Sequence, residues 1–291
     1  MEHVKVHYKK INPGTDYLQR QAHQLNVNDE RFAVDICEPI YQQLFFRQKN
    51  AYWMFAEAIK LHGLTADQSY FSRGLDYIDL AVHTAETLMQ GMLNRSGEPI
   101  VVTHQSQQLS LPYWQLNKRI GWLDWSNYLC QAISRRAHSS VDLLMKFTPQ
   151  MAAEYTSEPR EYTAFYVRYL QGMLDPAADH DALQQEFTEV HAREFHLRFR
   201  AALAPFYCLA KEDEAGFEAA ILHGSKIHRA YVKKVSNKMD MDPLGFYPPQ
   251  LIAAASLAYD RHGWRLQHKN DYLPEWWIYN TFTAPELAEK G

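Results

Sequence analysis

The chain has 291 residues, which is enough for one large domain or two small ones. Its hydrophobic share of 46% and charged share of 22% are those of a globular protein and argue against a disordered or fibrous chain. A formal net charge of −4 at pH 7 gives no overall attraction to nucleic acid or to an anionic membrane, and favours a basic protein partner.

The ends and the cysteines predict a cytoplasmic protein. The first ten residues, MEHVKVHYKK, contain no apolar segment that could act as a signal peptide. The longest apolar stretch, 251–259, is much shorter than the roughly 20 residues that span a bilayer. Cys37, Cys130 and Cys208 are far apart and lie in apolar helical contexts, which is typical of buried thiols in a reducing compartment.

Helical periodicity dominates the first third of the chain. It predicts helices at about 28–46, 50–62 and 65–93, of which Pro39 can interrupt the first, Gly63 ends the second and Thr65 caps the third. The segment 97–111 differs, because a glycine, a proline and the β-branched pair Val101 and Val102 precede a polar run. This segment is predicted to be a loop or one short β-hairpin.

The remaining two thirds also show helical spacing. Helices are predicted from about Asp124 to Ala137, from Ser139 or Ser140, from Thr148-Pro149, and at 160–174, 180–210, 213–236 and 249–262. Short loops favour antiparallel packing of successive helices. We therefore predict an all-α fold, an array of antiparallel helical hairpins packed as a single domain over 1–291, with an N-terminal half at about 15–94 and a C-terminal half at about 112–291.

Sequence signatures of catalysis are missing. The chain contains no GxxxxGK[ST], GxGxxG or GxSxG motif, no cysteine pairs at zinc spacing, and no Glu-x-x-His motif of the di-iron enzymes. We accordingly predict no catalytic residues, no cofactor and no metal.

One alternative is a helical metal- or ligand-dependent enzyme. Asp76, Asp79, His83 and Glu86 fall within about 80° of one another on the long helix, where they could hold a divalent cation. The apolar residues of that helix lie on nearly the opposite side, which favours a solvated charged face instead.

His191, Glu194 and His196 form a second polar group, on the helix predicted at 180–210. Glu194 falls within the predicted buried stripe, where Arg198, four residues later, could pair with its carboxylate. A structural ion pair is therefore favoured over a metal site. The stripe consists of Leu183, Phe187, Val190 and Leu197.

Charge is distributed unevenly along the chain. Between residues 150 and 190 eight acidic residues face only Arg160 and Arg168, for a local charge of −6. Such a surface suits a basic partner through charge complementarity, although a solvated face that aids solubility would look the same. The eight residues, our candidate contact set, are Glu154, Glu158, Glu161, Asp175, Asp179, Asp181, Glu186 and Glu189.

The C-terminal segments carry a family resemblance. DPLGF at 242–246, LIAAASLAYD at 251–260 and DYLPEW at 271–276 resemble the immunity protein 49 family of bacterial polymorphic-toxin systems, and ISRR at 133–136 before VDLL at 141–144 is similar to its middle region. The resemblance covers about the last 170 residues. These are packing motifs: small alanines allow close helix contact, Gly263 caps a helix, and 272–274 turns an apolar strap over the core.

The resemblance implies a cytoplasmic antidote that binds and neutralises a cognate toxin, such as a type VI secretion effector, delivered by neighbouring cells. It further implies a nuclease or other nucleic-acid-targeting toxin, basic and encoded by the adjacent gene, with no direct contact of this chain to nucleic acid or membrane. The family provides no catalytic residues to transfer. A helical-repeat adaptor with several partners is a further alternative.

Overall fold

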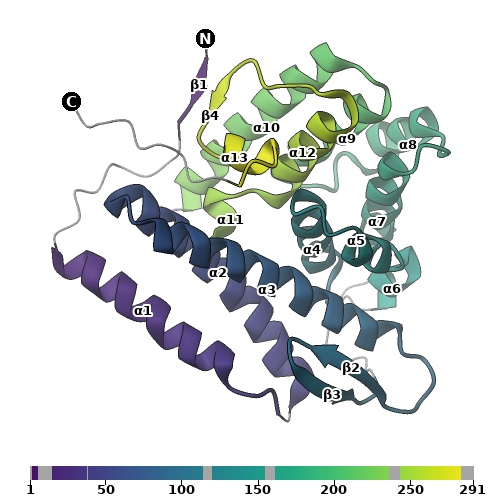
Figure 1. The fold of residues 1–291 in the computed structure, drawn as a ribbon. Coiled ribbons are helices and arrows are strands. Elements are labelled where there is room, and N and C mark those ends of the chain that lie inside the picture. Colours follow the sequence, from purple (N-terminus) through teal and green to yellow (C-terminus); the bar gives the residue numbers. More distant parts are fainter. Residues whose placement is uncertain are drawn as a thin grey trace. The chain divides into compact units, whose positions relative to one another are not determined.

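The fold is given by a computed structural model that describes residues 2–5, 15–37, 39–113, 120–154, 161–235 and 243–282. The chain divides into two compact units, which we call the N-terminal unit (8–118 with 282–291) and the C-terminal unit (1–7 with 119–281). Helices predominate in both units, so the predicted all-α fold is confirmed (Figure 1). Within the described ranges, every helix is too short or too polar to cross a membrane.

The N-terminal unit consists of helices and one hairpin. Its elements are α1 (Thr15–Ala33), α2 (Ile40–Thr65), α3 (Gln68–Leu93), β2 (Ile100–His104) and β3 (Gln107–Leu111). Helices α2 and α3 lie side by side as a long helical hairpin, and β2 pairs antiparallel with β3 so that His104 faces Gln107 (Figure 1). The short β-hairpin predicted near 97–111 is therefore present.

Several predicted helix boundaries in this unit were wrong. Asn28 and Asp29 lie inside α1, and α2 passes through Gly63 to end at Thr65, followed by the C-cap residue Ala66, whose φ is 62°. Asp67, and not Thr65, caps α3 by accepting a hydrogen bond from the Ser69 amide at 2.8 Å. Glycine is common just after helix ends but is also tolerated inside helices. The position of Gly63 alone was therefore not sufficient to predict where the helix ends.

Close packing of α2 against α3 depends on Gly91. A Cβ at this position would lie 2.5 Å from the buried ring of Tyr41, whose hydroxyl donates to the Pro112 carbonyl at 2.6 Å. We expect Gly91→Ala to lower the free energy of unfolding by about 1–3 kcal/mol, because the ring cannot move away without breaking that bond. Gly63→Ala, where a Cβ meets nothing within 4 Å, is expected to stabilise by up to about 1 kcal/mol. Urea denaturation of both variants checks the difference, and equal effects would contradict it.

The C-terminal unit contains the remaining elements. In its first part these are β1 (His3–Val4), α4 (Trp122–Ser134), α5 (His138–Leu144), α6 (Pro149–Glu154), α7 (Glu161–Leu174), α8 (His180–Glu186) and a π-helix (Phe187–His191). They continue with α9 (Leu197–Ala210), α10 (Glu214–Val235), α11 (Pro243–Phe246), α12 (Pro249–His262), β4 (Lys269–Asn270) and α13 (Glu275–Ile278). Strand β1 pairs in parallel with β4.

The core of this unit is built around α12. Its alanines at 253, 254, 255 and 258 are buried, and α12 packs against α4 and α9. Gly263 ends the helix in the left-handed conformation with φ 70°, and Tyr272 and Leu273 are buried. The packing roles predicted for these motifs are confirmed.

Arg136 connects three segments of the C-terminal unit. Its guanidinium pairs with both carboxylate oxygens of Asp260 on α12 at 3.0 Å, and it donates to the carbonyls of Trp277 and Ile278 at 2.9 and 2.6 Å. A further bond of 2.7 Å reaches the Ser134 carbonyl at the end of α4. One side chain therefore joins the ends of α4, α12 and α13.

The three thiols differ in their surroundings. Cys130 is buried, Cys208 is partly buried and Cys37 is exposed. The expectation of burial was wrong for Cys37, because the residue lies in the irregular segment between α1 and α2 and not in a helix.

Candidate functional site

The predicted acidic residues divide into two groups along the chain, one before or at the start of α7 and one after its end. Glu154 and Glu161 lie near its start, and the other group follows its end. Fourteen residues at 1.5 Å per residue place the two ends of α7 about 20 Å apart, but the chain then folds back along α7, since Glu186 pairs with Arg168 and His191 stacks on Phe165. Glu158 lies outside the described residues. The second group, which we call the acidic corner, consists of Asp175, Asp179, Asp181, Glu186 and Glu189.

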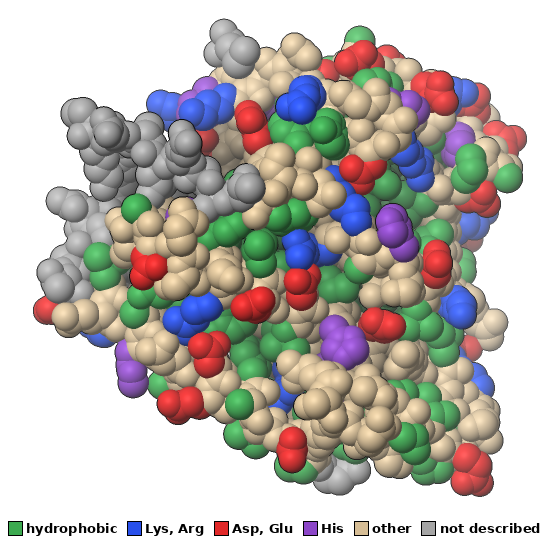
Figure 2. Space-filling view, viewed as in Figure 1, with side chains coloured by type: hydrophobic (Ala, Val, Ile, Leu, Met, Phe, Trp, Pro, Cys, Tyr) green, Lys and Arg blue, Asp and Glu red, His purple; other side chains and the backbone are tan. Residues whose placement is uncertain are grey.

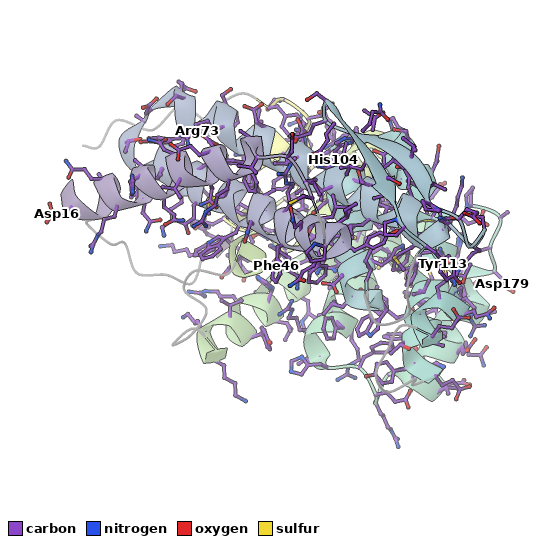
Figure 3. All side chains as sticks on the ribbon, turned by 90° about the horizontal axis from the view of Figure 1, so that it is seen from below. Asp16, Phe46, Arg73, His104, Tyr113 and Asp179 are labelled. Carbon is purple, nitrogen blue, oxygen red and sulfur yellow. The ribbon has the colours of Figure 1, made fainter. Side chains whose placement is uncertain are left out.

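Backbone contacts fix two carboxylates of the acidic corner. One oxygen of Asp175 accepts from the Ala177 amide at 2.9 Å, and one oxygen of Asp179 caps α8 by accepting from the Ala182 amide at 3.0 Å. Both side chains are exposed, and acidic side chains gather around α8, with Asp179 at the outer edge (Figures 2 and 3). These charges are therefore held in place at the surface.

Two other acids of the corner are paired with basic side chains. Asp181 binds Lys211 at 2.9 Å and accepts from the Tyr207 hydroxyl at 3.0 Å, and both bonds hold the pKa of Asp181 below its usual range. Glu186 pairs with Arg168. Among the described residues no ion pair involves Asp175, Asp179 or Glu189, so these three carry the corner's net negative charge.

A break in the predicted helix at 180–210 shapes the surface beside these acids. Helix α8 continues as a π-helix, and a turn over residues 192–196 precedes α9. Val190 and Leu197, predicted to be buried, are 59% and 44% exposed. The prediction failed because the extra residue of a π-turn shifts the register of every later side chain.

The same break changes the partner of Glu194. Its carboxylate lies 2.9 Å from Nδ1 of the buried His191, and Arg198 instead stacks over the Tyr231 ring at 4.6 Å. The predicted Glu194–Arg198 pair was therefore wrong. Beneath the turn, the His191 ring stacks on Phe165 with centroids 4.2 Å apart. Val190 and Leu197, which we call the exposed apolar pair, therefore lie at the two ends of this turn, and Val190 directly follows Glu189.

The candidate metal-binding face of α3 consists of Asp76, Asp79, His83 and Glu86. Of these residues, His83 has a structural role. Nε2 of His83 accepts from the Gln105 amide at 2.9 Å, which ties α3 to the hairpin turn. Glu86 lies 3.7 Å from Nδ1 of the same ring. Across the described ranges, no group of three or more His, Cys, Asp or Glu side chains is arranged to hold a metal ion, and this includes Asp76 and Asp79.

Sequence comparison assigns the family. The profile described as immunity protein 49 matches residues 79–277, which is more than half of the chain. The chain belongs to the immunity protein 49 family. Comparisons with curated proteins and with solved structures gave no match.

The immunity protein 49 match covers the acidic corner, the exposed pair at 190 and 197, and the Arg136–Asp260 contact. The segments compared in the sequence analysis, ISRR, LIAAASLAYD and DYLPEW, all lie within it. Helices α1 and α2 and the first part of α3 precede it. The resemblance inferred from these segments is therefore confirmed.

Proposed function

We propose that this immunity protein 49 family member neutralises a cognate toxin by binding it stoichiometrically in the cytoplasm of the producing cell. The observation that carries the proposal is the family match over residues 79–277. The proposed toxin belongs to a polymorphic system such as type VI secretion and is encoded by the adjacent gene.

The toxin is proposed to be a nuclease or another nucleic-acid-targeting protein. Such proteins need basic surfaces to bind phosphates, and a basic surface is complementary to this acidic chain. The acidic corner provides three exposed carboxylates, those of Asp175, Asp179 and Glu189, that form no ion pair within the part of the chain that the structure describes. Glu154, Glu158 and Glu161 are the remaining residues of the proposed contact set.

The exposed apolar pair, Val190 and Leu197, is proposed to form the apolar core of this contact surface. Protein interfaces combine a desolvated apolar core with a polar rim. Val190 directly follows Glu189 in the π-helix and Leu197 begins α9 after the turn, so a toxin that meets the charge of Glu189 is proposed also to cover these side chains. The binding energy is proposed to come from the apolar pair and the encounter rate from the acids.

Val190→Asp is expected to weaken toxin binding at least about tenfold, because a carboxylate would be desolvated in the interface. Stability should be unchanged, since Val190 is exposed. Calorimetric titration of the purified toxin checks the affinity. The matched control is Val101→Asp on β2, where the valine is 70% exposed and no toxin contact is proposed. Equal affinities of the two variants would remove the pair from the interface.

The function itself is tested by growth. A host that expresses the product of the adjacent gene should form colonies only when this chain is co-expressed, whereas an empty vector should give none. A second immunity protein 49 family member from another locus serves as the specificity control and should not rescue. A harmless neighbour, or killing in spite of co-expression, would contradict the proposal.

A further inference from the structure

A cationic surface lies in the C-terminal unit where α9 begins and α10 ends. The two helices lie side by side (Figure 1). The Ala201 carbonyl lies close to Gly224, and Arg198 contacts Tyr231, so the helices run antiparallel and bring these two ends together. Residues 219–235 of α10 include no acidic residue, and their basic residues are Lys226, Arg229, Lys233 and Lys234. Positive charge therefore predominates on this part of the unit.

Aromatic rings hold the side chain of Arg198 in place. Its guanidinium carbon lies 4.6 Å from the centroid of the Tyr231 ring and 5.6 Å from that of the Phe199 ring. The Phe199 ring in turn packs against Trp122, with centroids 5.5 Å apart. Contact with the face of a ring positions a guanidinium without using its N–H groups. Arg198 is therefore positioned before a partner binds.

The N–H groups of this guanidinium are available to a partner. The side chain of Arg198 forms no hydrogen bond or ion pair with the described residues, since the nearby Glu194 contacts His191 instead, at 2.9 Å. The residue is partly exposed, and none of its side-chain nitrogens is a buried atom that lacks a partner. A free guanidinium offers a planar pair of donors that matches the two oxygens of a carboxylate.

The side chains next to Arg198 support a role in binding an anion. Lys234 is exposed, forms no ion pair within the described ranges, and follows Tyr231 by three residues, on the same face of α10. On the other side, Nδ1 of His196 accepts from the Arg198 amide at 3.2 Å, and the His196 carbonyl accepts from the Phe199 amide at 2.9 Å. These backbone amides of α9 are already hydrogen-bonded, so side chains are the donors that a partner meets.

The surroundings favour a protein carboxylate over the phosphates of a nucleic acid. Leu197, a member of the exposed apolar pair, directly precedes Arg198 and is 44% exposed. An apolar group beside a cation suits a protein interface, where polar contacts surround an apolar core. Glu189 and Glu194, both exposed, precede this surface along the chain and would repel a polyanion. A single carboxylate avoids most of this repulsion.

We propose that Arg198, held by the Tyr231 ring and flanked by Lys234, binds the carboxylate of an aspartate or glutamate side chain on a protein partner. On the basis of the proposed function, this partner is the toxin. The toxin surface then presents basic residues to the acidic corner and an acidic residue to Arg198, on either side of the exposed apolar pair. Opposite charges at the two sides fix the orientation in which the toxin binds.

Arg198→Gln is expected to weaken toxin binding at least about tenfold, mainly through faster dissociation, because the toxin carboxylate would lose its charged partner. If the toxin surface opposite Arg198 were basic, removing this cation would instead leave the affinity unchanged or raise it. Surface plasmon resonance with the purified toxin measures both rate constants. Unchanged or tighter binding would overturn the proposal.

The matched control is Arg265→Gln in the same unit. Arg265 is exposed, and its guanidinium carbon lies 4.5 Å from the centroid of the Tyr279 ring. The control therefore removes the same charge and the same kind of aromatic contact, at a position where no toxin contact is proposed. Its toxin affinity should change less than about twofold. An equal loss of affinity in the two variants would show a general effect of charge and overturn the assignment of Arg198.

Two substitutions of Tyr231 test whether the ring positions Arg198. Tyr231→Leu removes the ring and should weaken toxin binding about fivefold, because Arg198 would then have to be ordered on binding. Tyr231→Phe keeps the ring and should change the affinity less than about twofold. Equal affinities of the two variants would overturn this role of the ring.

A small probe tests the site on the purified full chain without the toxin. N-acetyl-glutamate methylamide should shift the Arg198 side-chain resonances saturably at millimolar concentrations, and the neutral glutamine analogue should bind at least about fivefold more weakly. No saturable binding, or equal binding of both probes, would overturn the proposal. Displacement of the probe by a single-stranded oligonucleotide would indicate that the site binds phosphate, which would also overturn it. A wild-type chain that binds the probe but no toxin would refute the proposed function and the toxin as the partner, while the carboxylate site would stand.

Discussion

Arg136→Ala is expected to lower the free energy of unfolding by about 3 kcal/mol, the low end for breaking a buried ion pair. The guanidinium is 12% exposed, and its loss would remove both bonds to Asp260 and leave the carbonyls of Trp277 and Ile278 without this donor. The low end is appropriate because Asp260 is 35% exposed and solvent screens its charge. The melting temperature should fall by roughly 6–12 °C.

A second substitution separates the side chain from the backbone at this position. The φ angle of Arg136 is 58°, a conformation that strains alanine but not glycine. Arg136→Gly should therefore be more stable than Arg136→Ala by up to about 1 kcal/mol. Lys146→Ala, at an exposed cationic position in the same unit, is the control and should change stability by less than about 0.5 kcal/mol. Thermal denaturation that ranks Arg136→Ala with the control would refute the role of the guanidinium.

Neutralising three acids of the corner is expected to slow toxin association about tenfold at low salt, because long-range attraction accelerates the encounter of oppositely charged surfaces. The triple variant is Asp175→Asn, Asp179→Asn and Glu189→Gln. Asparagine can still cap α8 at position 179, so the fold should persist. Stopped-flow kinetics over a range of salt concentrations should also show a weaker salt dependence.

The control is a second triple variant that changes the net charge by the same amount but at residues outside the acidic corner. Asp16→Asn, Glu30→Gln and Glu98→Gln remove three exposed acids from the N-terminal unit. If association slows equally in both triples, the effect follows net charge and the acidic corner is not the contact surface. A parallel triple at Glu154, Glu158 and Glu161 tests whether the other acids of the predicted contact set contribute.

Periodicity in the sequence was sufficient to predict the fold class and most helices. Helix α3 was predicted to within three residues because its apolar side chains repeat over seven turns without interruption. The break between α8 and α9 was not predictable, because a π-turn uses ordinary helical residues and only the register of the later side chains reveals it. Glu194 and Arg198 were accordingly paired from a spacing that the structure does not keep.

Contacts between segments that are distant in the sequence could not be predicted either. Arg136 and Asp260 belong to two segments that were compared with the family separately, yet nothing in either segment indicates that 124 residues of chain bring them together. The acidic residues show the opposite case, since Glu161 and Asp175, counted in one cluster from the sequence, lie at opposite ends of α7.

Titration of toxin activity with this chain tests the central claim, neutralisation by binding, most directly. At toxin concentrations well above the dissociation constant, activity should fall linearly and reach its minimum at one equivalent of chain, independent of the time of incubation. Inactivation that continues with time at a small fraction of an equivalent would show that the chain acts as a catalyst. Such a result would contradict the account.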